Sequence, residues 1–547
     1  MRFFFAITLF LTFGFNLFAS DPTWKWAKQV GGNGYDKASC IVSTPENVYW
    51  SGFFSDTITF GNTVLVPKSE DAFLIKSDNF GEMNWVLQCG GIGSQIIHKI
   101  DIINLNYSVI VGSFSESLNI GDYNFTSTGK QDGFISKINE NGTPSWVKII
   151  KGLEDNVSNF ILSDEQNNIY VSGYFKGQLI FDGDTLQNES VNNYSSFVIK
   201  LNSNGEKIWI KKMGGLQYSN VFIYGMENAA DESIFMAGSL LGFPTFDIGD
   251  TLEIGNKSNG FLAKMNENGN FNWVKPTGEF SGQFSNIAID GDENIYITAN
   301  FGYNSTHSAV LDTITIFSSG NFDDIVVAKF DKNANIQWAK VGGSFNFQDQ
   351  PLDIEVKNNG DTYIGGWFGG DKLIWQTDTL FSFGGGDIFL VKFNTEGDLI
   401  WLKQAGGNPS DDVDEITDID LQNEDIFCVG NFTNSCYFDT ILLDNGVNGN
   451  GFLALLDESE LTNIQTEHNS FEKVLIYPNP TNRFLSILGM DTGLEEIEYS
   501  IFDIYGKILK SERYIGMPIS VEHLQNGIYF IKIKQLENTS IYKFIVE

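Results

Sequence analysis

Side chains able to do acid–base or nucleophilic chemistry are few in this sequence, and their spacing forms no recognised catalytic set. The chain has only four histidines: His98, His307, His468 and His523. A Ser–His–Asp triad or a zinc site needs a histidine close to fixed partners, and no such spacing occurs around these four. We interpret them as core or surface residues. The sequence therefore gives no catalytic, cofactor-binding or metal-binding residue.

Acidic side chains gather in turns, where calcium binding is the chemistry to consider. Residues 290–294 (DGDEN) resemble the start of a calcium loop, and residues 411–420 form an acidic run. Calcium requires six or more oxygen ligands and usually a bidentate carboxylate further along the loop. The corresponding turns at residues 164–168 and 358–361 do not repeat the carboxylate pattern. We interpret these segments as plain turns and predict no cofactor, with calcium as the alternative.

The cysteines are too few for a disulfide framework. They are Cys40, Cys89, Cys428 and Cys436. In an exported protein Cys428 and Cys436 could form a bridge within a hairpin, since they are only eight positions apart. Free thiols buried in strands are an equally supported alternative.

The composition indicates an acidic, β-rich protein. A chain of 547 residues exceeds what one core normally supports, so several domains or a repeat assembly is expected. Charged residues are 19% and aromatic residues 14% of the chain, which favours strands and turns over amphipathic helices. The 69 acidic and 34 basic residues give a net charge of -35. This charge argues against nucleic acid or anionic lipid as a partner, and it suits extracellular solubility or the attraction of cations.

Residues 1–20 have the features of a secretory signal peptide. A basic residue at position 2 precedes an apolar run over residues 3–17, and the small residues Ala19 and Ser20 follow. The apolar run is too short for a comfortable membrane span. The sequence therefore predicts export.

The main regularity of the chain is a tryptophan motif that occurs seven times. Its first copy is WAKQVGG, Trp26 to Gly32, and successive copies are 59 to 65 residues apart. Seven copies of one supersecondary unit predict a closed ring or a stacked array. The copies begin at Trp26, Trp85, Trp146, Trp209, Trp273, Trp338 and Trp401.

A strand of the type FLxK precedes each later tryptophan at a constant distance. Nine residues lead from its lysine to the tryptophan in all six cases, across a turn with glycine in every copy except at Ala334. Such turns supply the positive φ angles of tight hairpins, so the two segments are predicted to be neighbouring antiparallel strands. We expect the tryptophan to pack between sheets, and the lysine to lie across the sheet edge with its charge solvated. The lysines are Lys76, Lys137, Lys200, Lys264, Lys329 and Lys392.

Two further strands precede each FLxK segment. Runs such as VYWSGFF around Gly52 and IYVSGYF around Gly173 indicate strands buried on both faces, and in most copies a shorter run comes before them. A further hairpin, such as residues 179–186, is inserted before FLxK. Seven four-stranded units predict an all-β fold, a seven-bladed β-propeller with little helix.

The two ends of the repeat region predict how the ring closes. Trp26 has no FLxK strand before it, and the last such strand, residues 452–455, has no tryptophan after it. These two orphan strands would complete the final blade, with one strand from the N-terminus and three from the C-terminus. An open array would leave both edges exposed to aggregation, so closure is favoured.

The repeats carry the pattern NxYxxG, then DxFLxKxNxxGxxxW, then GG, and resemble the bacterial propeller repeats known as SBBP repeats. The resemblance covers residues 21–457 and implies a propeller, without a particular ligand. We therefore divide the chain into a signal peptide (1–20), the propeller (21–457), a polar linker (458–473) and a last domain (474–547).

The last domain contains short segments with alternating apolar residues, and seven of them predict a small Ig-like β-sandwich. Its YPNP, FDIYGK and LQNGIYFIKI motifs, with the terminal YKFIVE, closely resemble the type A C-terminal sorting domain of the type IX secretion system. The resemblance implies export across a Gram-negative outer membrane, with the type IX export and sortase machinery as partners. The product would be released or lipid-anchored. The motif residues are Tyr477, Pro478, Asn479, Pro480, Asp503, Gly506, Gly527, Tyr529 and Lys543.

Six Asp-Thr-apolar triplets lie in the inserted hairpins. They resemble O-glycosylation sites of bacteria that use this export route, but Asp and Thr also suit turns, and we favour turn chemistry. The triplets begin at Asp56, Asp184, Asp250, Asp312, Asp378 and Asp439.

Taken together, these patterns predict a secreted or surface-attached propeller that acts as a binding or adhesion module for an extracellular protein or glycan. Ligands of such folds usually bind to loops of one face, and loop length here varies most after the GG segments and in the inserted hairpins. The alternative is an extracellular polysaccharide hydrolase or lyase, which would need two carboxylates from different blades in one pocket. An inert structural spacer is the third class, and the fold alone does not decide.

Overall fold

The computed structural model describes two compact parts of the chain, Met1–Leu461 and Thr462–Glu547, which we call the ring domain and the C-terminal domain. Among the described residues there is no α-helix, and hence none long and apolar enough to cross a membrane. The predicted signal peptide lies outside the described residues. These are residues 22–546 except 105–106, 189–191, 215–219, 242–258, 278–282, 303–307, 321, 346, 377, 408–412, 460–474, 478–482, 489–496, 503–506, 515–517, 522 and 536–537.

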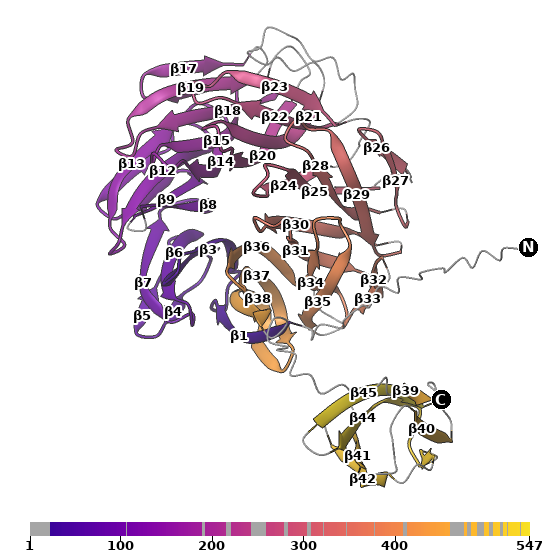
Figure 1. Cartoon of the computed structure of the whole chain (residues 1–547). Coiled ribbons are helices and arrows are strands. Elements are labelled where there is room, and N and C mark those ends of the chain that lie inside the picture. Colours follow the sequence, from indigo (N-terminus) through magenta and orange to yellow (C-terminus); the bar gives the residue numbers. More distant parts are fainter. Residues whose placement is uncertain are drawn as a thin grey trace, which may run out of the picture. The chain divides into compact units, whose positions relative to one another are not determined.

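Strand pairing arranges the described ring domain in seven repeats of four antiparallel strands, which follow chain order in the first six repeats (Figure 1). Repeat 1 contains β2 (Lys37–Ser43), β3 (Asn47–Phe54), β6 (Asp71–Asp78) and β7 (Met83–Gly90). Repeat 2 contains β8 (Gln95–Ile103), β9 (Tyr107–Phe114), β12 (Asp132–Asn139) and β13 (Pro144–Ile150). Repeat 3 contains β14 (Asn156–Ser163), β15 (Ile169–Lys176), β18 (Tyr194–Leu201) and β19 (Lys207–Met213). Repeat 4 contains β20 (Asn220–Asn228), β21 (Ile234–Leu241), β22 (Asn259–Met265) and β23 (Phe271–Pro276).

The remaining repeats follow the same order. Repeat 5 contains β24 (Gln283–Ile289), β25 (Ile295–Phe301), β28 (Asp324–Phe330) and β29 (Ile336–Gly343). Repeat 6 contains β30 (Asp349–Val356), β31 (Thr362–Gly369), β34 (Gly386–Phe393) and β35 (Leu399–Gly407). Repeat 7 contains β36 (Glu415–Gln422), β37 (Asp425–Phe438), β38 (Ile441–Asp457) and, from the other end of the chain, β1 (Thr23–Val30).

The closure predicted from the two orphan strands is present. β1 pairs antiparallel with β38, and Trp26 lies opposite Leu455. In the other six repeats the FLxK lysine lies opposite the tryptophan in the same way, as in the pair Lys76 and Trp85. The first strand of each repeat contacts the first strand of the next, and β36 of repeat 7 contacts β2 of repeat 1 (Figure 1). The first strands therefore form a closed inner circle.

The inserted hairpins predicted before the FLxK strands are also present. Where the pairing is resolved, a hairpin joins the last strand of the preceding repeat, as β10 joins β7 and β32 joins β29. The hairpins therefore link neighbouring repeats at the outside of the ring. They are β4–β5 (Ile58–Phe60, Thr63–Leu65), β10–β11 (Ser117–Ile120, Tyr123–Thr126), β16–β17 (Gln178–Phe181, Asp184–Gln187), β26–β27 (Ser308–Leu311, Ile314–Phe317) and β32–β33 (Lys372–Trp375, Asp378–Phe381).

The core lies between adjacent repeats and explains the Gly-x-aromatic motif of the second strands. Each FLxK phenylalanine is fully buried, and in most repeats its ring packs against the glycine of the strand beside it. A Cβ added at Gly173 would lie 2.0 Å from the Val157 carbonyl oxygen and 2.5 Å from the Phe197 ring. No side chain fits there, so glycine at this position is a requirement of close packing.

The C-terminal domain contains the seven short strands that the sequence predicts, in two sheets of its described residues. One sheet has the order β42-β41-β44-β45, and the other has the order β39-β40-β43. Ile501, Ile531 and Phe544 are fully buried in the core of this domain. The strands are β39 (Leu475–Tyr477), β40 (Phe484–Leu488), β41 (Ile497–Phe502), β42 (Ile508–Tyr514), β43 (Ile519–Ser520), β44 (Gly527–Gln535) and β45 (Asn538–Val546).

Candidate functional site

The strand order places the connections of each repeat on two opposite faces of the ring. Because the strands are antiparallel, the turns after the first and third strands share one face, which we call the turn face. The connections after the second and fourth strands share the other, which we call the loop face. Hydrogen bonds join the two kinds of connection on the loop face: Ser319 Oγ donates to the Ser344 carbonyl at 3.0 Å, and the Asp349 amide donates to the Asp323 carbonyl at 2.9 Å.

The loop face holds many large apolar side chains in solvent. They lie in the connections of repeats 1, 2, 5 and 6 and in the segment from β1 to β2, and they include aliphatic as well as aromatic residues. Exposed apolar side chains that gather on one face of a soluble protein are typical of interaction surfaces. These residues are Tyr35, Val66, Ile92, Leu153, Phe317, Phe322, Phe345, Phe347, Phe381 and Phe383.

A pocket opens among these side chains in repeat 6. It has a volume of about 570 Å³, and Phe347, Phe381 and Phe383 line it together with Asp371 and the glycines around them. Phe347 precedes β30, Asp371 precedes β32, and the other two phenylalanines flank Ser382 at the end of β33. The three phenyl rings keep 51%, 68% and 51% of their surface exposed, in chain order. Such a pocket offers aromatic faces and one carboxylate to a ligand.

Buried aspartates hold the loops that form this pocket. Asp387 accepts a hydrogen bond from the Phe383 amide at 2.6 Å. Asp349 accepts the amides of Ser344 at 2.6 Å and Gly369 at 3.1 Å, so it joins the loop before β30 to the end of β31. Burial raises the pKa of Asp349 to about 7, although these donors oppose the rise. The aspartates therefore fix the backbone on both sides of the phenylalanines.

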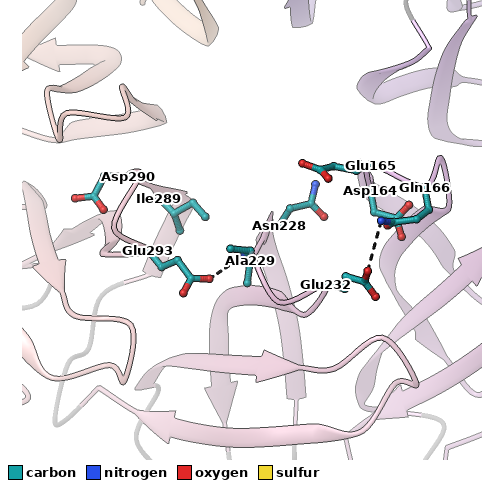
Figure 2. A pocket seen from close by; sticks show the side chains of 11 residues that line it. Asp164, Glu165, Gln166, Asn228, Ala229, Glu232, Ile289, Asp290 and Glu293 are labelled. Atoms are coloured by element: carbon teal, nitrogen blue, oxygen red, sulfur yellow. Dashed lines mark hydrogen bonds between the residues drawn. The ribbon is translucent and has the colours of Figure 1, made fainter.

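The turn face has a different pocket, of about 340 Å³, formed by the first turns of repeats 3, 4 and 5 (Figure 2). Five carboxylates line it, with Gln166 and Asn228 beside them. Two hydrogen bonds tie the turns together: the Ala230 amide donates to Glu293 at 2.9 Å, and Gln166 donates to Glu232 at 3.5 Å (Figure 2). The carboxylates are those of Asp164, Glu165, Glu232, Asp290 and Glu293.

The segment that resembles a calcium loop, residues 290–294, is built as a turn. One carboxylate oxygen of Asp290 accepts the amides of Asp292 and Asn294, at 3.0 and 2.9 Å. The other accepts the Asn294 side-chain amide at 2.8 Å and the Tyr296 hydroxyl at 3.0 Å. These four donors use the oxygens that a cation would need. Among the described residues, no group of three or more His, Cys, Asp or Glu side chains has the arrangement of a metal site.

The acidic run over residues 411–420 was interpreted as a plain turn, but its second half is the short strand predicted before the Gly-x-aromatic strand, and that strand prediction is confirmed. Asp418 and Asp420 lie in β36, in the inner circle of first strands. Asp418 accepts the Ile41 amide at 2.7 Å and Asp420 accepts the Ser43 amide at 2.8 Å, both from β2 of the next repeat. The amides of an inner edge strand have no ladder partner, and the aspartates supply one.

Other ionisable groups lie in the same inner circle. Lys99 donates to Asp418 at 2.7 Å across the intervening repeat. Glu227 and Glu355 receive no hydrogen bond within the described part of the chain. Burial raises the pKa of Glu227 to about 8, with Lys99 opposing the rise, and burial followed by neighbouring carboxylates raises that of Glu355. An acidic residue two positions from another, as in residues 353–355 and 418–420, was the available sequence signal for this group.

The recurrent lysine does not keep its charge in solvent, contrary to the sequence expectation. Lys200 and Lys392 are buried, and the turn of the following repeat covers the lysine. Between repeats 5 and 6, Lys329 donates to the Thr395 hydroxyl at 2.8 Å and Trp338 donates to the Thr395 carbonyl at 3.0 Å. Lysine and tryptophan together therefore fasten one repeat to the next on the turn face.

Glu458 takes the place of this covering turn in repeat 7, where β1 comes from the other end of the chain. The sequence assigned Glu458 to the linker, but its carboxylate is 1% exposed in the ring domain. It accepts hydrogen bonds from Lys357 at 2.8 Å, Lys392 at 3.1 Å, Trp401 at 3.3 Å and the Tyr363 hydroxyl. Burial raises its pKa, but the donors outweigh burial and the pKa is lowered overall.

The histidines and cysteines of the described residues do not form a site. His98 contacts the Ser113 hydroxyl at 2.9 Å, and burial lowers its pKa to about 4. His307 and His468 lie outside the described residues. All four cysteines are free and buried. Of the two alternatives left open for Cys428 and Cys436, free thiols buried in a strand are confirmed. A bridge is absent because both cysteines lie on the one strand β37, where eight positions correspond to roughly 26 Å.

The sorting-motif residues are only partly described. Tyr477 ends β39, Gly527 begins β44, and Lys543 lies in β45 opposite Phe530. The Tyr529 ring stacks on Phe544 at 5.8 Å, and its hydroxyl donates to the Gln525 carbonyl at 2.8 Å. Pro478, Asn479, Pro480, Asp503 and Gly506 lie outside the described residues. Of the Asp-Thr-apolar triplets, the one at Asp250 also lies outside, while Thr57, Thr185, Thr313, Thr379 and Thr440 are exposed.

Comparison with known proteins identifies the family of the last domain. Residues 475–547 match the family described as "Secretion system C-terminal sorting domain". This segment is a sorting domain. It marks proteins that are exported by type IX secretion to the cell surface or the extracellular space, and it implies an interaction of the chain with that machinery.

Several proteins are similar to this chain at low sequence identity. An uncharacterized WD repeat-containing protein of Acanthamoeba polyphaga mimivirus is 22% identical over 76% of this chain, and the match covers 36% of that relative's length. Similar solved structures include a PL25 ulvan lyase, a polysaccharide lyase (9% identity, 74% of this chain, 92% of that chain, TM-score 0.39). Semaphorin 2a of Drosophila is 7% identical; the match covers 96% of this chain and 99% of that chain, with a TM-score of 0.39. PorZ, a surface component of the type IX secretion system of Porphyromonas gingivalis, is 11% identical; the match covers 95% of this chain and 100% of that chain, with a TM-score of 0.16.

Proposed function

We propose that the chain is an exported, seven-bladed β-propeller over residues 21–457, of the SBBP-repeat type, with an Ig-like sorting domain over residues 474–547. Support for seven blades comes from the seven four-stranded repeats, the pairing of β1 with β38, and the contact of β36 with β2. A polar linker over residues 458–473 would join the two domains, although the carboxylate of its first residue, Glu458, is buried in the ring domain. A signal peptide over residues 1–20 would direct the chain across the inner membrane before type IX secretion.

The function that the geometry supports best is binding of an extracellular protein by the loop face. The observation that carries this proposal is the set of exposed apolar side chains on the loop face, from Tyr35 to Phe383. On the turn face the recurrent polar groups are used in fastening the repeats together. Large apolar side chains held in solvent contribute little to the stability of a free protein, and their burial against a partner provides favourable free energy for binding.

The mixture of side chains favours a protein over a glycan as the partner. Sugars stack on aromatic rings, whereas Val66, Ile92 and Leu153 offer no ring to stack on. A protein surface buries aliphatic and aromatic side chains alike, and aromatic residues dominate the energetics of protein interfaces. The apolar residues also extend over several repeats, which is wider than a short saccharide requires.

The test is capture of secreted and surface proteins of the source bacterium on the immobilised full chain. We expect a protein to be retained by the wild type and by the turn-face variant E165Q/E232Q/E293Q, and lost from the loop-face variant F347S/F381S/F383S. The substituted side chains of both variants line surface pockets, so both should fold. Equal capture by the two variants, or no capture by the wild type, would overturn the proposal.

An extracellular polysaccharide hydrolase or lyase is the second candidate. The observation in its favour is that carboxylates from three repeats surround the turn-face pocket, as a two-carboxylate mechanism requires. Against it, Asp290 and Glu293 already accept hydrogen bonds from the turns. Incubation of the full chain with a panel of polysaccharides decides the matter: release of reducing ends that is lost in E165Q would establish the enzyme.

A further inference from the structure

The pocket of repeat 6 combines two kinds of chemistry in one place. Phe347, Phe381 and Phe383 line it with half-exposed rings, and Asp371 contributes a carboxylate. Within the described residues this carboxylate accepts no hydrogen bond; only the backbone carbonyl of Asp371 is used, by the Ser382 amide at 3.0 Å. The carboxylate is therefore free to interact with a ligand.

The backbone that carries these rings is fixed before any ligand arrives. The Phe347 ring lies against Gly370, where an added Cβ would be 2.4 Å from it. The Phe383 amide is held by Asp387, and the Gly384 amide donates to the Ser382 hydroxyl at 2.9 Å. Pre-organised loops lose less conformational entropy on binding, so the pocket is suited to a specific contact.

A cation is the ligand group that uses all of these features. The face of an aromatic ring attracts a cation through the ring's quadrupole, and cages of several rings bind ammonium groups in this way. A carboxylate beside the rings adds a charge-assisted hydrogen bond. The chain as a whole has a net charge of -35, so it attracts basic partners and repels acidic ones.

We propose that this pocket receives a basic side chain of the protein partner, which makes the partner a basic protein. The inference rests on the proposed function of the loop face and deepens it by naming the chemistry of the partner. The cationic group lies against the three phenylalanines and pairs with Asp371. Neighbouring exposed apolar residues such as Phe345 contact the partner's surface around the pocket. The turn-face pocket, which has carboxylates but no aromatic ring, provides the matched control.

The experiment measures binding of a lysine-rich peptide to the immobilised full chain, at about 0.3 M salt so that non-specific charge attraction is screened. We expect D371N and F347L/F381L/F383L each to weaken binding by about tenfold or more, since leucine keeps the apolar surface but removes the ring faces. The turn-face variant E165Q/E232Q/E293Q should bind within about twofold of the wild type, and the lysine-acetylated peptide should not bind.

Three results would overturn the inference: unchanged binding in both loop-face variants, equal binding of the acetylated peptide, or loss of binding in the turn-face variant alone. Thermal unfolding of each variant confirms that it is folded. The proposed function is judged separately by capture of the natural partner. If F347S/F381S/F383S loses that partner while the basic peptide fails to bind the wild type, the loop-face function stands and the basic partner is wrong.

Discussion

The two faces of the ring use the same repeat for opposite purposes. On the turn face, lysines and tryptophans of several repeats donate to the turn of the next repeat, as Lys329 and Trp338 do with Thr395. On the loop face, buried aspartates fix the loops while apolar side chains such as Phe381 stay in solvent. The turn face is built for stability, and the loop face is left available for binding.

The spacing of the sequence reflects this division. The distance from the FLxK lysine to the tryptophan is nine residues in six repeats, because the turn between them must reach the neighbouring repeat. Loop-face connections vary in length and composition, although hydrogen bonds such as that from the Asp349 amide to the Asp323 carbonyl join neighbouring repeats there as well. Constant segments therefore report on stability, and variable segments report on the ligand.

The largest effect on the turn face is expected from Glu458→Ala. It leaves Lys357 and Lys392 without the buried carboxylate that closes repeat 7, at a cost of about 3 kcal/mol in the free energy of unfolding. Urea denaturation of the full chain measures this loss. The control is Glu424→Ala, a half-exposed partner of the same Lys357, for which a change below about 1 kcal/mol is expected. Equal effects of the two substitutions would contradict the role of Glu458.

Substitutions at two glycines distinguish the cost of crowding a tryptophan ring from the cost of backbone strain. Gly142 has φ +83°, and an added Cβ would lie 2.9 Å from the Trp85 ring; Gly183 has φ +85° with nothing within 4 Å. Gly183→Ala should therefore cost about 1 kcal/mol in the free energy of unfolding, and Gly142→Ala clearly more. Denaturation curves compare them. A Gly142→Ala cost no larger than that of Gly183→Ala would show that the tryptophan contact adds nothing.

The inner circle of first strands is expected to make stability depend on pH. The folded pKa of Glu227 is about 8, raised by burial, and lies above its unfolded value. Such a carboxyl favours the folded state fully below the unfolded pKa, and this contribution is lost as the pH rises through the folded pKa. The Tm should fall between pH 5 and pH 8. Glu227→Gln should leave the Tm unchanged near pH 5 and raise it at pH 8, and a pH-independent difference would refute this assignment.

The smallest effect is expected at Ala334, where the repeat lacks its turn glycine. Ala334 has φ +57°, a backbone angle that costs energy for any residue with a Cβ. Ala334→Gly should raise the free energy of unfolding by about 0.5 kcal/mol, the strain relief less the entropy of glycine. Loop-face substitutions such as Phe381→Ser should leave it within about 0.5 kcal/mol. A destabilised A334G would mean that contacts of the methyl group outweigh the strain.

Repetition made much of the fold predictable from sequence. The fixed interval between lysine and tryptophan predicted their pairing, and the two unpaired ends predicted that β1 completes repeat 7, as the position of Trp26 opposite Leu455 confirms. The sequence could not show what lies on the far side of each sheet. The buried state of Lys200 and the capture of Glu458 by repeat 6 depend on contacts between repeats, which no local pattern reports.

The candidate site was less predictable for two reasons. Exposed loop phenylalanines such as Phe345 and Phe383 are the same residue type as the buried phenylalanines of the strands. Only the structure shows which of them are exposed. Acidic residues near a turn were interpreted as turn residues, although Asp418 and Asp420 belong to a strand. The same segment also has the apolar pattern of a short strand, and of the two interpretations the strand is confirmed.

Hydroxyl-radical footprinting of the full chain with its captured partner tests the central claim most directly. Phe345, Phe381 and Phe383 report on the loop face, and Phe80, 72% exposed in a turn between β6 and β7, reports on the turn face. We predict that the partner protects the three loop-face residues from oxidation and leaves Phe80 as reactive as in the free chain. Protection of Phe80 with unchanged oxidation of the loop-face residues would contradict the account.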